Sequence, residues 1–237
     1  MIYMFDIDGT LTEPRQKMTS EFEQFFIKWM NCKSVFLVTG SDMEKVKEQV
    51  PLNVINKCAG IFTSMGNEMH YLGRLKYKNE VEFPETLIAW LQQQVEFSPW
   101  SKKTSNHFEY RPGMLNFSTI GRNATKEQRE EYYTWDQQVL ERVRISNYIN
   151  SKYPEFEACI GGQISIDIQA RGKNKSQALQ WIRENYSEPV YFFGDRCNPG
   201  GNDHAICQAL DKDQIGGYYM NVEGPSDLKN HLDDMED

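Results

Sequence analysis

Short apolar runs alternate with amphipathic stretches at both ends of the chain. The runs that end near residues 5, 39 and 193 have the length of buried strands, and a stretch with helical spacing follows each of them. The first of these stretches places Phe22, Phe26 and Trp29 on one face. Repeated strand, turn and helix are typical of a parallel sheet covered by helices. The pattern predicts an α/β fold with a Rossmann-like parallel sheet.

Local sequence signals predict where several elements begin. Ser20 with Glu23, and Ser41 with Glu44, have the spacing of capping boxes, which predicts helices that start there. Short strands are expected at 61–63 and 68–72 around a Gly-Asn turn, and Pro84 is expected to open another amphipathic helix.

The alternation breaks in the middle of the chain. Residues 108–118 and 158–168 have strand patterns, and a long polar helical segment lies between them at about 125–152. Strands without an intervening βαβ rhythm indicate an α+β insert. We therefore expect a core domain at 1–81 and 186–237, and an inserted domain at 82–185.

Composition narrows the functional class. The 237 residues are 39% apolar, which is ample for packed cores, and the formal net charge is −8. An acidic chain is a poor binder of nucleic acid or anionic membranes, because both attract clustered positive charge. No signal peptide or membrane span is evident, and five irregularly spaced cysteines fit reduced thiols, so we expect a cytoplasmic protein.

The first strand ends in the most informative motif, Asp6-Ile7-Asp8-Gly9-Thr10-Leu11-Thr12. In an extended segment, residues two apart point the same way, so the two aspartates need a cation between or beside them. If Mg²⁺ is held by Asp6 and an oxygen near Asp8, then Asp6 can attack phosphorus and Asp8 can move a proton. An ordinary turn after a strand is the plainer alternative, which the complete motif disfavours.

Other polar residues follow predicted strands or start helices on the same edge of the sheet. Ligands bind beyond the carboxyl ends of parallel strands, so these residues are candidates for the same site. Thr39 and Ser41 could face a phosphoryl oxygen, although plain helix capping explains either hydroxyl alone. Lys175 could balance charge at Asp6. Asp195 is the candidate second carboxylate for Mg²⁺, supported by Asn202 and Asp203.

The inserted domain carries an arginine cluster in an otherwise acidic protein, at Arg111, Arg122 and Arg129. Guanidinium groups hold phosphate through forked hydrogen bonds, although a single arginine is more often a surface ion-pair partner. Ser165 and Asp167 are expected on one face of a strand, where a hydroxyl and a carboxylate suit sugar hydroxyls.

The opening motif resembles the nucleophile loop of the haloacid dehalogenase superfamily. Taken with RPGMLNFSTIGR, GGQISID and FFGDRCNPGGNDH, nearly the whole chain resembles the eukaryotic-type phosphomannomutases, which are capped members of subclass IIB. The resemblance implies a haloacid dehalogenase core with an inserted α+β cap. It also implies interconversion of mannose 6-phosphate and mannose 1-phosphate through an aspartyl phosphate and a hexose bisphosphate, which supplies GDP-mannose synthesis.

The resemblance implies roles for individual residues. Asp6 would be the nucleophile and Asp8 the general acid and base, with Lys175 completing the catalytic set. The implied Mg²⁺ ligands and their support are Asp6, Asp8, Asp195, Asn202 and Asp203. The implied substrate-binding residues are Arg15, Thr39, Ser41, Arg111, Arg122, Arg129, Ser165 and Asp167. A hexose 1,6-bisphosphate activator, a hexose phosphate substrate and a homodimer formed through the cap are expected with them.

Several positions depart from the family pattern, at Lys173 and Asn174, at Arg196 and Cys197, and at Ala209. Arg196 replaces a lysine beside Asp195, which is not a conservative change, and Ala209 replaces the carboxylate of a second cation site. An Mg²⁺-dependent sugar-phosphate phosphatase on the same fold is therefore the alternative. A non-catalytic sugar-phosphate-binding protein is a third reading, which the retained nucleophile disfavours.

Overall fold

A computed structural model describes residues 1–235 of the chain, which form two compact units. The first unit combines Met1–Lys78 with the chain from Lys173 onward, and the second is Asn79–Gly172. The inserted unit therefore ends earlier than the expected boundary at 185. Helix α7 (Ser176–Asn185) packs its apolar face in the first unit, which is why the boundary moves.

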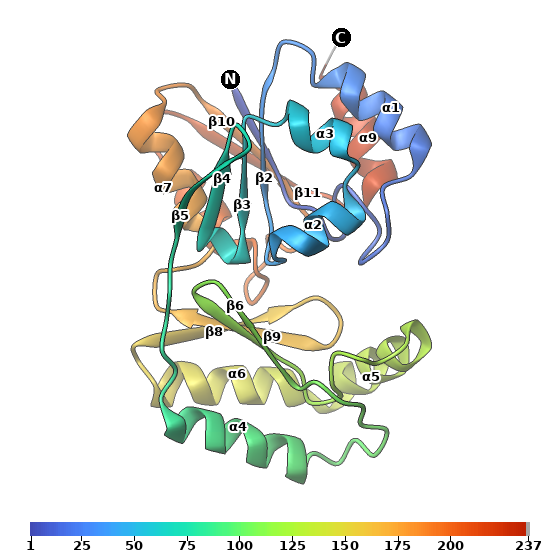
Figure 1. The fold of residues 1–237 in the computed structure, drawn as a ribbon, viewed down its shortest axis with the longest axis vertical. Helices are drawn as coiled ribbons and strands as arrows, with labels where there is room; N and C mark the ends of the chain where they lie inside the picture. The colour runs from blue at the N-terminus through green and yellow to red at the C-terminus, as the bar shows by residue number, and fades with distance from the viewer. Residues whose placement is uncertain (236–237) are drawn as a thin grey trace. The chain divides into compact units, whose positions relative to one another are not determined.

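The first unit is built on a seven-stranded sheet (Figure 1). In spatial order its strands are β11 (Gly217–Asn221), β10 (Val190–Gly194), β1 (Ile2–Phe5), β2 (Ser34–Val38), β3 (Gly60–Thr63), β4 (Glu68–Tyr71) and β5 (Arg74–Lys78). The first five are parallel, as predicted, and β4 and β5 continue the sheet as antiparallel strands. The sequence prediction did not include β5, which is mostly exposed and lacks an apolar pattern.

Alternating side chains of the parallel strands fill two cores, one on each face of the sheet. Phe5, Leu37 and Phe193 face α1 (Ser20–Trp29), α2 (Met43–Gln49), α3 (Leu52–Lys57) and α9 (Pro225–Asp234). Met4 and Phe192 face α7 and α8 (His204–Asp211). Figure 1 shows α1, α3 and α9 on the side of the sheet opposite α7. This covered parallel sheet confirms the predicted fold class.

Helix starts differ from the predictions by one residue. The side chain of Thr19, not Ser20, accepts the Phe22 amide and caps α1. Asp42, not Ser41, caps α2 by accepting the Lys45 amide. In both places a neighbouring residue with a suitable oxygen takes the capping position. Ser41 is thereby left to make contacts in the site.

The second unit is a four-stranded antiparallel sheet with helices packed on it (Figure 1). Its strands, in spatial order, are β6 (Phe108–Arg111), β7 (Met114–Phe117), β9 (Ser165–Ala170) and β8 (Phe156–Gly161). Its helices are α4 (Glu85–Phe97), α5 (Lys126–Val139) and α6 (Glu141–Lys152). Residue Leu140, with a φ of 54°, divides the predicted helical segment in two. Each predicted strand region forms a hairpin.

The sheet of the second unit has one apolar face, which packs against helices, and one polar face. Leu115, Phe117, Ile166 and Ile168 pack against α4 and α6. Because side chains alternate along a strand, the opposite face carries the polar residues of β6, β7 and β9. This face holds most of the residues that the sequence predicted to bind substrate in the insert.

Candidate active site

Asp6 and Asp195 are neighbours because β1 and β10 are. Each residue lies at the carboxyl end of its strand, and the Asp6 amide donates to the carbonyl of Phe193 at 2.9 Å. Gly9 packs against Asp195 so closely that a Cβ atom on it would lie 2.4 Å from Asp195 Oδ2. Since Gly9 also has a φ of 87°, both conformation and space require glycine in this loop.

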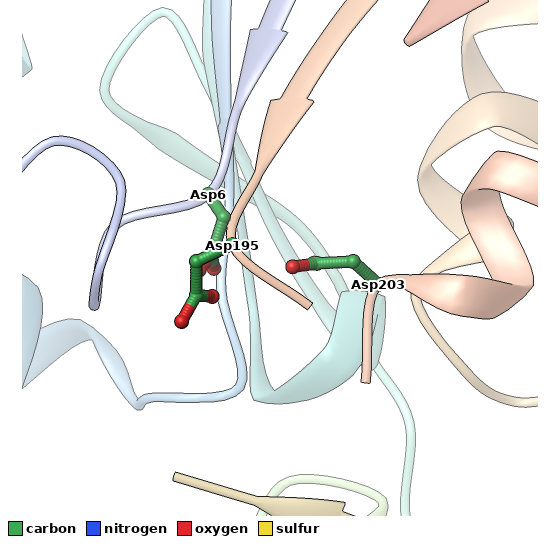
Figure 2. Close-up of side chains that lie close together, drawn as sticks. All are labelled: Asp6, Asp195 and Asp203. Atoms are coloured by element: carbon green, nitrogen blue, oxygen red, sulfur yellow. The ribbon is translucent and has the colours of Figure 1, made fainter. Parts of the chain in front are cut away.

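Asp203 reaches the same point from the loop before α8. The carboxylates of Asp6, Asp195 and Asp203 present ligand oxygens that all lie within 4.8 Å of one another. Figure 2 shows Asp6 and Asp195 extending from the ends of their strands, with Asp203 directed toward them. Oxygen ligands this close together are suited to a hard divalent cation such as Mg²⁺.

Lys175 is buried beside these carboxylates at the start of α7. Its Nζ lies 2.6 Å from Asp6 Oδ1 and 2.6 Å from Asp203 Oδ1, and the side chain is completely shielded from solvent. Burial lowers the pKa of Lys175, but the charges of Asp203 and Asp6 outweigh it and raise the pKa above its usual value. The ammonium is therefore held in its charged form.

Lys175 and Arg196, whose Nε lies 3.6 Å from Asp195 Oδ2, do not balance the three carboxylates. Burial raises the pKa of Asp6 well above its usual value, and the charges of Asp203 and Asp195 add to this while Lys175 opposes it. Burial also raises the pKa of Asp195 to about 7, with a further contribution from Asp203. The surplus of negative charge favours a bound cation.

Two buried oxygens nearby also fit a bound ion or an anionic substrate. Asn202 Oδ1 and Thr10 Oγ1 are buried and have no hydrogen-bond partner in the described part of the chain. An amide oxygen is a hard ligand, and a hydroxyl can donate to a phosphoryl oxygen. The donor set thus fits Mg²⁺, with Asp6, Asp195 and Asp203 as its carboxylates, and Asn202 precedes Asp203 in the chain.

The side chain of Asp8 is not one of these three carboxylates, although its charge contributes to the raised pKa of Asp195. Asp8 Oδ1 accepts from the Arg15 amide and from Gln49 Nε2, each at 2.8 Å, and its Oδ2 accepts from Ser41 Oγ at 3.3 Å. The chain leaves the strand before Asp8, so the expectation that Asp6 and Asp8 point the same way is wrong. Carboxylate ligation of Mg²⁺ by Asp8 has no support here, whereas ligation by a backbone oxygen near Asp8 stays a prediction.

Gln49 was missed by the sequence reasoning. It is the last residue of α2 and is buried, and its amide orients the carboxylate of Asp8. Thr39, by contrast, was predicted, and its Oγ1 accepts from the Ser41 amide at 3.0 Å. This bond shapes the loop after β2, and Ser41 links that loop to Asp8.

The arginines of the inserted unit share a carboxylate that was also missed, that of Glu109. Arg111 Nε donates to Glu109 Oε1 and Arg122 Nε donates to Glu109 Oε2, both at 2.9 Å. Arg122 also donates to Ser165 Oγ at 2.8 Å. Two buried guanidinium groups share this carboxylate, and forked donors of this kind suit a phosphate.

The other predicted residues of this unit lie on two further contacts. Asp167 accepts from Asn116 Nδ2 across the β7–β9 pair. Arg129 donates to the carbonyls of Ala124 and Arg122. Arg129 therefore also shapes the loop that carries Arg122.

Comparisons with known proteins identify the family. The model of the eukaryotic phosphomannomutase family matches residues 22–236. The chain belongs to the eukaryotic phosphomannomutase family. A probable phosphomannomutase of Caenorhabditis elegans is 31% identical over 249 residues, which cover 99% of this chain and 94% of that protein. The phosphomannomutase of Spinacia oleracea is 34% identical over 221 residues, covering 87% and 86%.

Solved structures agree on the fold. A subclass IIB sugar phosphatase of the haloacid dehalogenase superfamily has a TM-score of 0.60 at 16% identity and covers 99% of this chain and 98% of its own. The IMP-nucleotidase of Plasmodium falciparum has a TM-score of 0.66 at 14% identity, with 99% and 68% covered. Membership of the phosphomannomutase family confirms the prediction of an enzyme, a phosphotransferase. None of the described helices has the length and apolar character needed to cross a membrane.

Proposed function

We propose that this member of the family is a phosphomannomutase that interconverts mannose 6-phosphate and mannose 1-phosphate. The observation that carries the proposal is Asp6 at the end of β1, buried against Lys175 and grouped with two further carboxylates, in a chain of this family. The same chemistry would supply mannose 1-phosphate for GDP-mannose synthesis.

The proposed reaction starts from a hexose 1,6-bisphosphate. The Asp6 carboxylate attacks phosphorus and the bond from phosphorus to the sugar oxygen breaks, while Asp8 gives that oxygen a proton. In the transfer to a hexose phosphate, Asp8 takes a proton from the attacking sugar hydroxyl, which displaces Asp6 from phosphorus. A bound Mg²⁺ would supply positive charge against the phosphoryl oxygens.

The core residues divide the remaining work. Lys175 keeps its charge next to Asp6 and offsets the negative charge that develops on the transferred group. The loop proposed to hold the phosphoryl oxygens contains Thr39 and Ser41, and Ser41 also contacts Asp8. Arg15, in the loop after β1, is proposed to bind the substrate.

The inserted unit is proposed to hold the phosphate that is not transferred. Arg111 and Arg122 supply forked donors that the shared carboxylate of Glu109 holds together. Arg129, which supports the loop of Arg122, would complete the anion site. Ser165 and Asp167 would contact sugar hydroxyls. A mutase needs such a second phosphate site, and a phosphatase does not.

The test is phosphorus NMR of the purified protein with Mg²⁺, mannose 1-phosphate and a trace of glucose 1,6-bisphosphate. Appearance of mannose 6-phosphate supports the mutase, and Asp6→Asn should abolish it while Asp211→Asn, at an exposed position, should not. Accumulation of inorganic phosphate without mannose 6-phosphate would instead indicate the phosphatase alternative.

A homodimer formed through the inserted unit is also proposed, from the family resemblance. Several large apolar side chains of that unit are exposed, including Phe97, Leu140 and Tyr148. Light scattering coupled to size exclusion would give the mass in solution, and a monomer at micromolar concentration would contradict the dimer.

A further inference from the structure

A strained turn follows β3 in the first unit. Ser64, Met65 and Gly66 have φ values of 50°, 62° and 87°, and all three are buried. Left-handed backbone at two non-glycine residues is unfavourable and persists only where the surroundings fix it. The turn is therefore held in place by its neighbours.

The turn holds the loop after β2. The Ser64 amide donates to the carbonyl of Ser41 at 2.8 Å, and the Met65 amide donates to the carbonyl of Thr39 at 2.9 Å. These two hydrogen bonds fix the backbone of the Thr39–Ser41 loop, which is proposed to bind the phosphoryl group. Any displacement of the turn would displace Thr39 and Ser41.

Two side-chain amides tie the same turn to the start of α7. Gln177 Nε2 donates to the Met65 carbonyl and to Asn67 Oδ1, each at 3.3 Å. Asn67 Nδ2 donates to the Ser64 carbonyl at 2.9 Å and to the Lys173 carbonyl at 3.3 Å. Both side chains are buried, so these bonds are shielded from competing water.

Lys175 lies in the chain between Lys173 and Gln177, the two residues of this segment that bond to Asn67. Asn174 Oδ1 accepts from the Ser176 amide at the start of α7, and the bonds at Lys173 and Gln177 fix the chain on either side of Lys175. Lys173 is also the residue at which the chain returns from the inserted unit. The preceding Gly172 has a φ of 79° and open space where a Cβ would lie. The amides fix the chain immediately after this unconstrained glycine.

We propose that Asn67 and Gln177 are positioning residues that hold Lys175 in register with the Thr39–Ser41 loop. The proposal rests on the proposed function, because it assumes that Lys175 and this loop act on the same phosphoryl group. The described hydrogen bonds of Asn67 and Gln177 join the two amides to each other and to backbone carbonyls rather than to the carboxylates. Their effect is to keep the ammonium and the phosphoryl-binding loop at a fixed separation, which governs the transfer step.

The prediction concerns the transfer step and not substrate affinity. Gln177→Met keeps the length of the side chain and removes both hydrogen bonds. We expect kcat, and the rate of enzyme phosphorylation by glucose 1,6-bisphosphate in a single turnover, to fall about 10-fold to 100-fold, since misplacing a catalytic group by about 1 Å has this effect. KM for mannose 1-phosphate should change less than about twofold, because the single phosphate of this substrate is proposed to bind the arginines of the inserted unit.

The matched control is Gln180→Met, on the exposed side of the same helix. It should retain wild-type kcat. All rates are measured well below the melting temperature of each variant. Wild-type kcat in Gln177→Met, or a rise in KM that accounts for the whole loss, would overturn the proposal.

Asn67→Ser provides a second test if Gln177→Met does not fold. It removes the bonds to the Ser64 and Lys173 carbonyls and the amide oxygen that accepts from Gln177, and a loss of kcat at constant KM is expected. A wild type that makes no mannose 6-phosphate would refute the mutase but not the positioning role. In that case the same variants are compared by hydrolysis of p-nitrophenyl phosphate, where an unchanged rate in both would overturn the positioning role by itself.

Discussion

The described contacts of the two units group buried charges in opposite proportions, with carboxylates in excess in the first unit and guanidinium groups in excess in the inserted unit. In the first unit, Lys175 faces a group of three carboxylates. In the inserted unit, Arg111 and Arg122 share the carboxylate of Glu109. Because both groups are buried, their electrostatic interactions with a bound ion would be stronger than in water. The difference indicates that the first site recruits a cation, while the second recruits an anion.

The largest loss of stability and activity is expected from a substitution that removes positive charge from the carboxylate group of the first unit. Lys175→Met removes the ammonium that Asp6 and Asp203 both contact and leaves buried carboxylates without it. We expect a loss of about 3–5 kcal/mol in the free energy of unfolding, and mutase activity below detection. Urea unfolding and phosphorus NMR measure these effects. Lys173→Met, at an exposed neighbouring position, should match the wild type. Wild-type stability in Lys175→Met would contradict the charge comparison.

The second surplus is tested by Arg122→Lys. A lysine keeps the charge but cannot reach Glu109 and Ser165 with a fixed fork. We expect KM for mannose 1-phosphate to rise at least about tenfold, while kcat falls less than about threefold, because ground-state and transition-state binding of the second phosphate weaken together. Steady-state kinetics measure this split. Arg144→Lys, at an exposed position, is the control, and an unchanged KM would count against the anion site.

The two sites also differ in how far the sequence predicted them. The meeting of Asp6 with Asp195 follows from parallel strands whose carboxyl ends share one edge, and the apolar runs predicted those strands. Glu109 and Gln49 gave no such signal. Their roles depend on how β6 and β7 pair and on where α2 ends, and a single sequence does not determine side-chain directions of that kind.

The position of Asp8 shows the same limit. The two-residue period of a strand predicted that Asp8 would point with Asp6, but β1 ends at Phe5 and the following turn redirects the chain. The motif identified the residues, whereas the turn decided their directions. The expected end of the inserted domain at 185 differs from the observed division for a related reason. Helix α7 has a strong apolar face, but the sequence does not show which of the two units that face packs against.

The pH dependence of stability provides an intermediate effect. The pKa of Asp195 is about 7 in the folded protein, above the ordinary value of 3.8, so the folded state holds its proton more tightly than the unfolded chain. Without metal, stability should therefore fall as the pH rises from about 4 to 7, by an amount on the order of a few kcal/mol.

Thermal unfolding in EDTA and in Mg²⁺ tests this dependence. Mg²⁺ should reduce the fall, since a bound cation stabilises the deprotonated carboxylate. Asp195→Asn should flatten the profile in EDTA. A stability that rises over the same range in the wild type, with no change in Asp195→Asn, would show that Asp195 does not carry the surplus.

The smallest expected effect concerns Arg196, which departs from the family pattern beside the carboxylate cluster. Its Nε lies 3.6 Å from Asp195 Oδ2, and its side chain is 28% exposed. A partly solvated guanidinium at this distance offsets some of the negative charge that would attract Mg²⁺, with an interaction of up to about 1 kcal/mol. Arg196→Gln should therefore tighten Mg²⁺ binding, by up to about fivefold, as measured by calorimetric titration of the substrate-free protein.

Raising the ionic strength should narrow the difference in Mg²⁺ affinity between the variant and the wild type, because salt screens the contact between Arg196 and Asp195. Weaker Mg²⁺ binding in the variant would mean that Arg196 supports the cation site by orienting Asp195, and that the cluster depends on its geometry more than on its surplus charge.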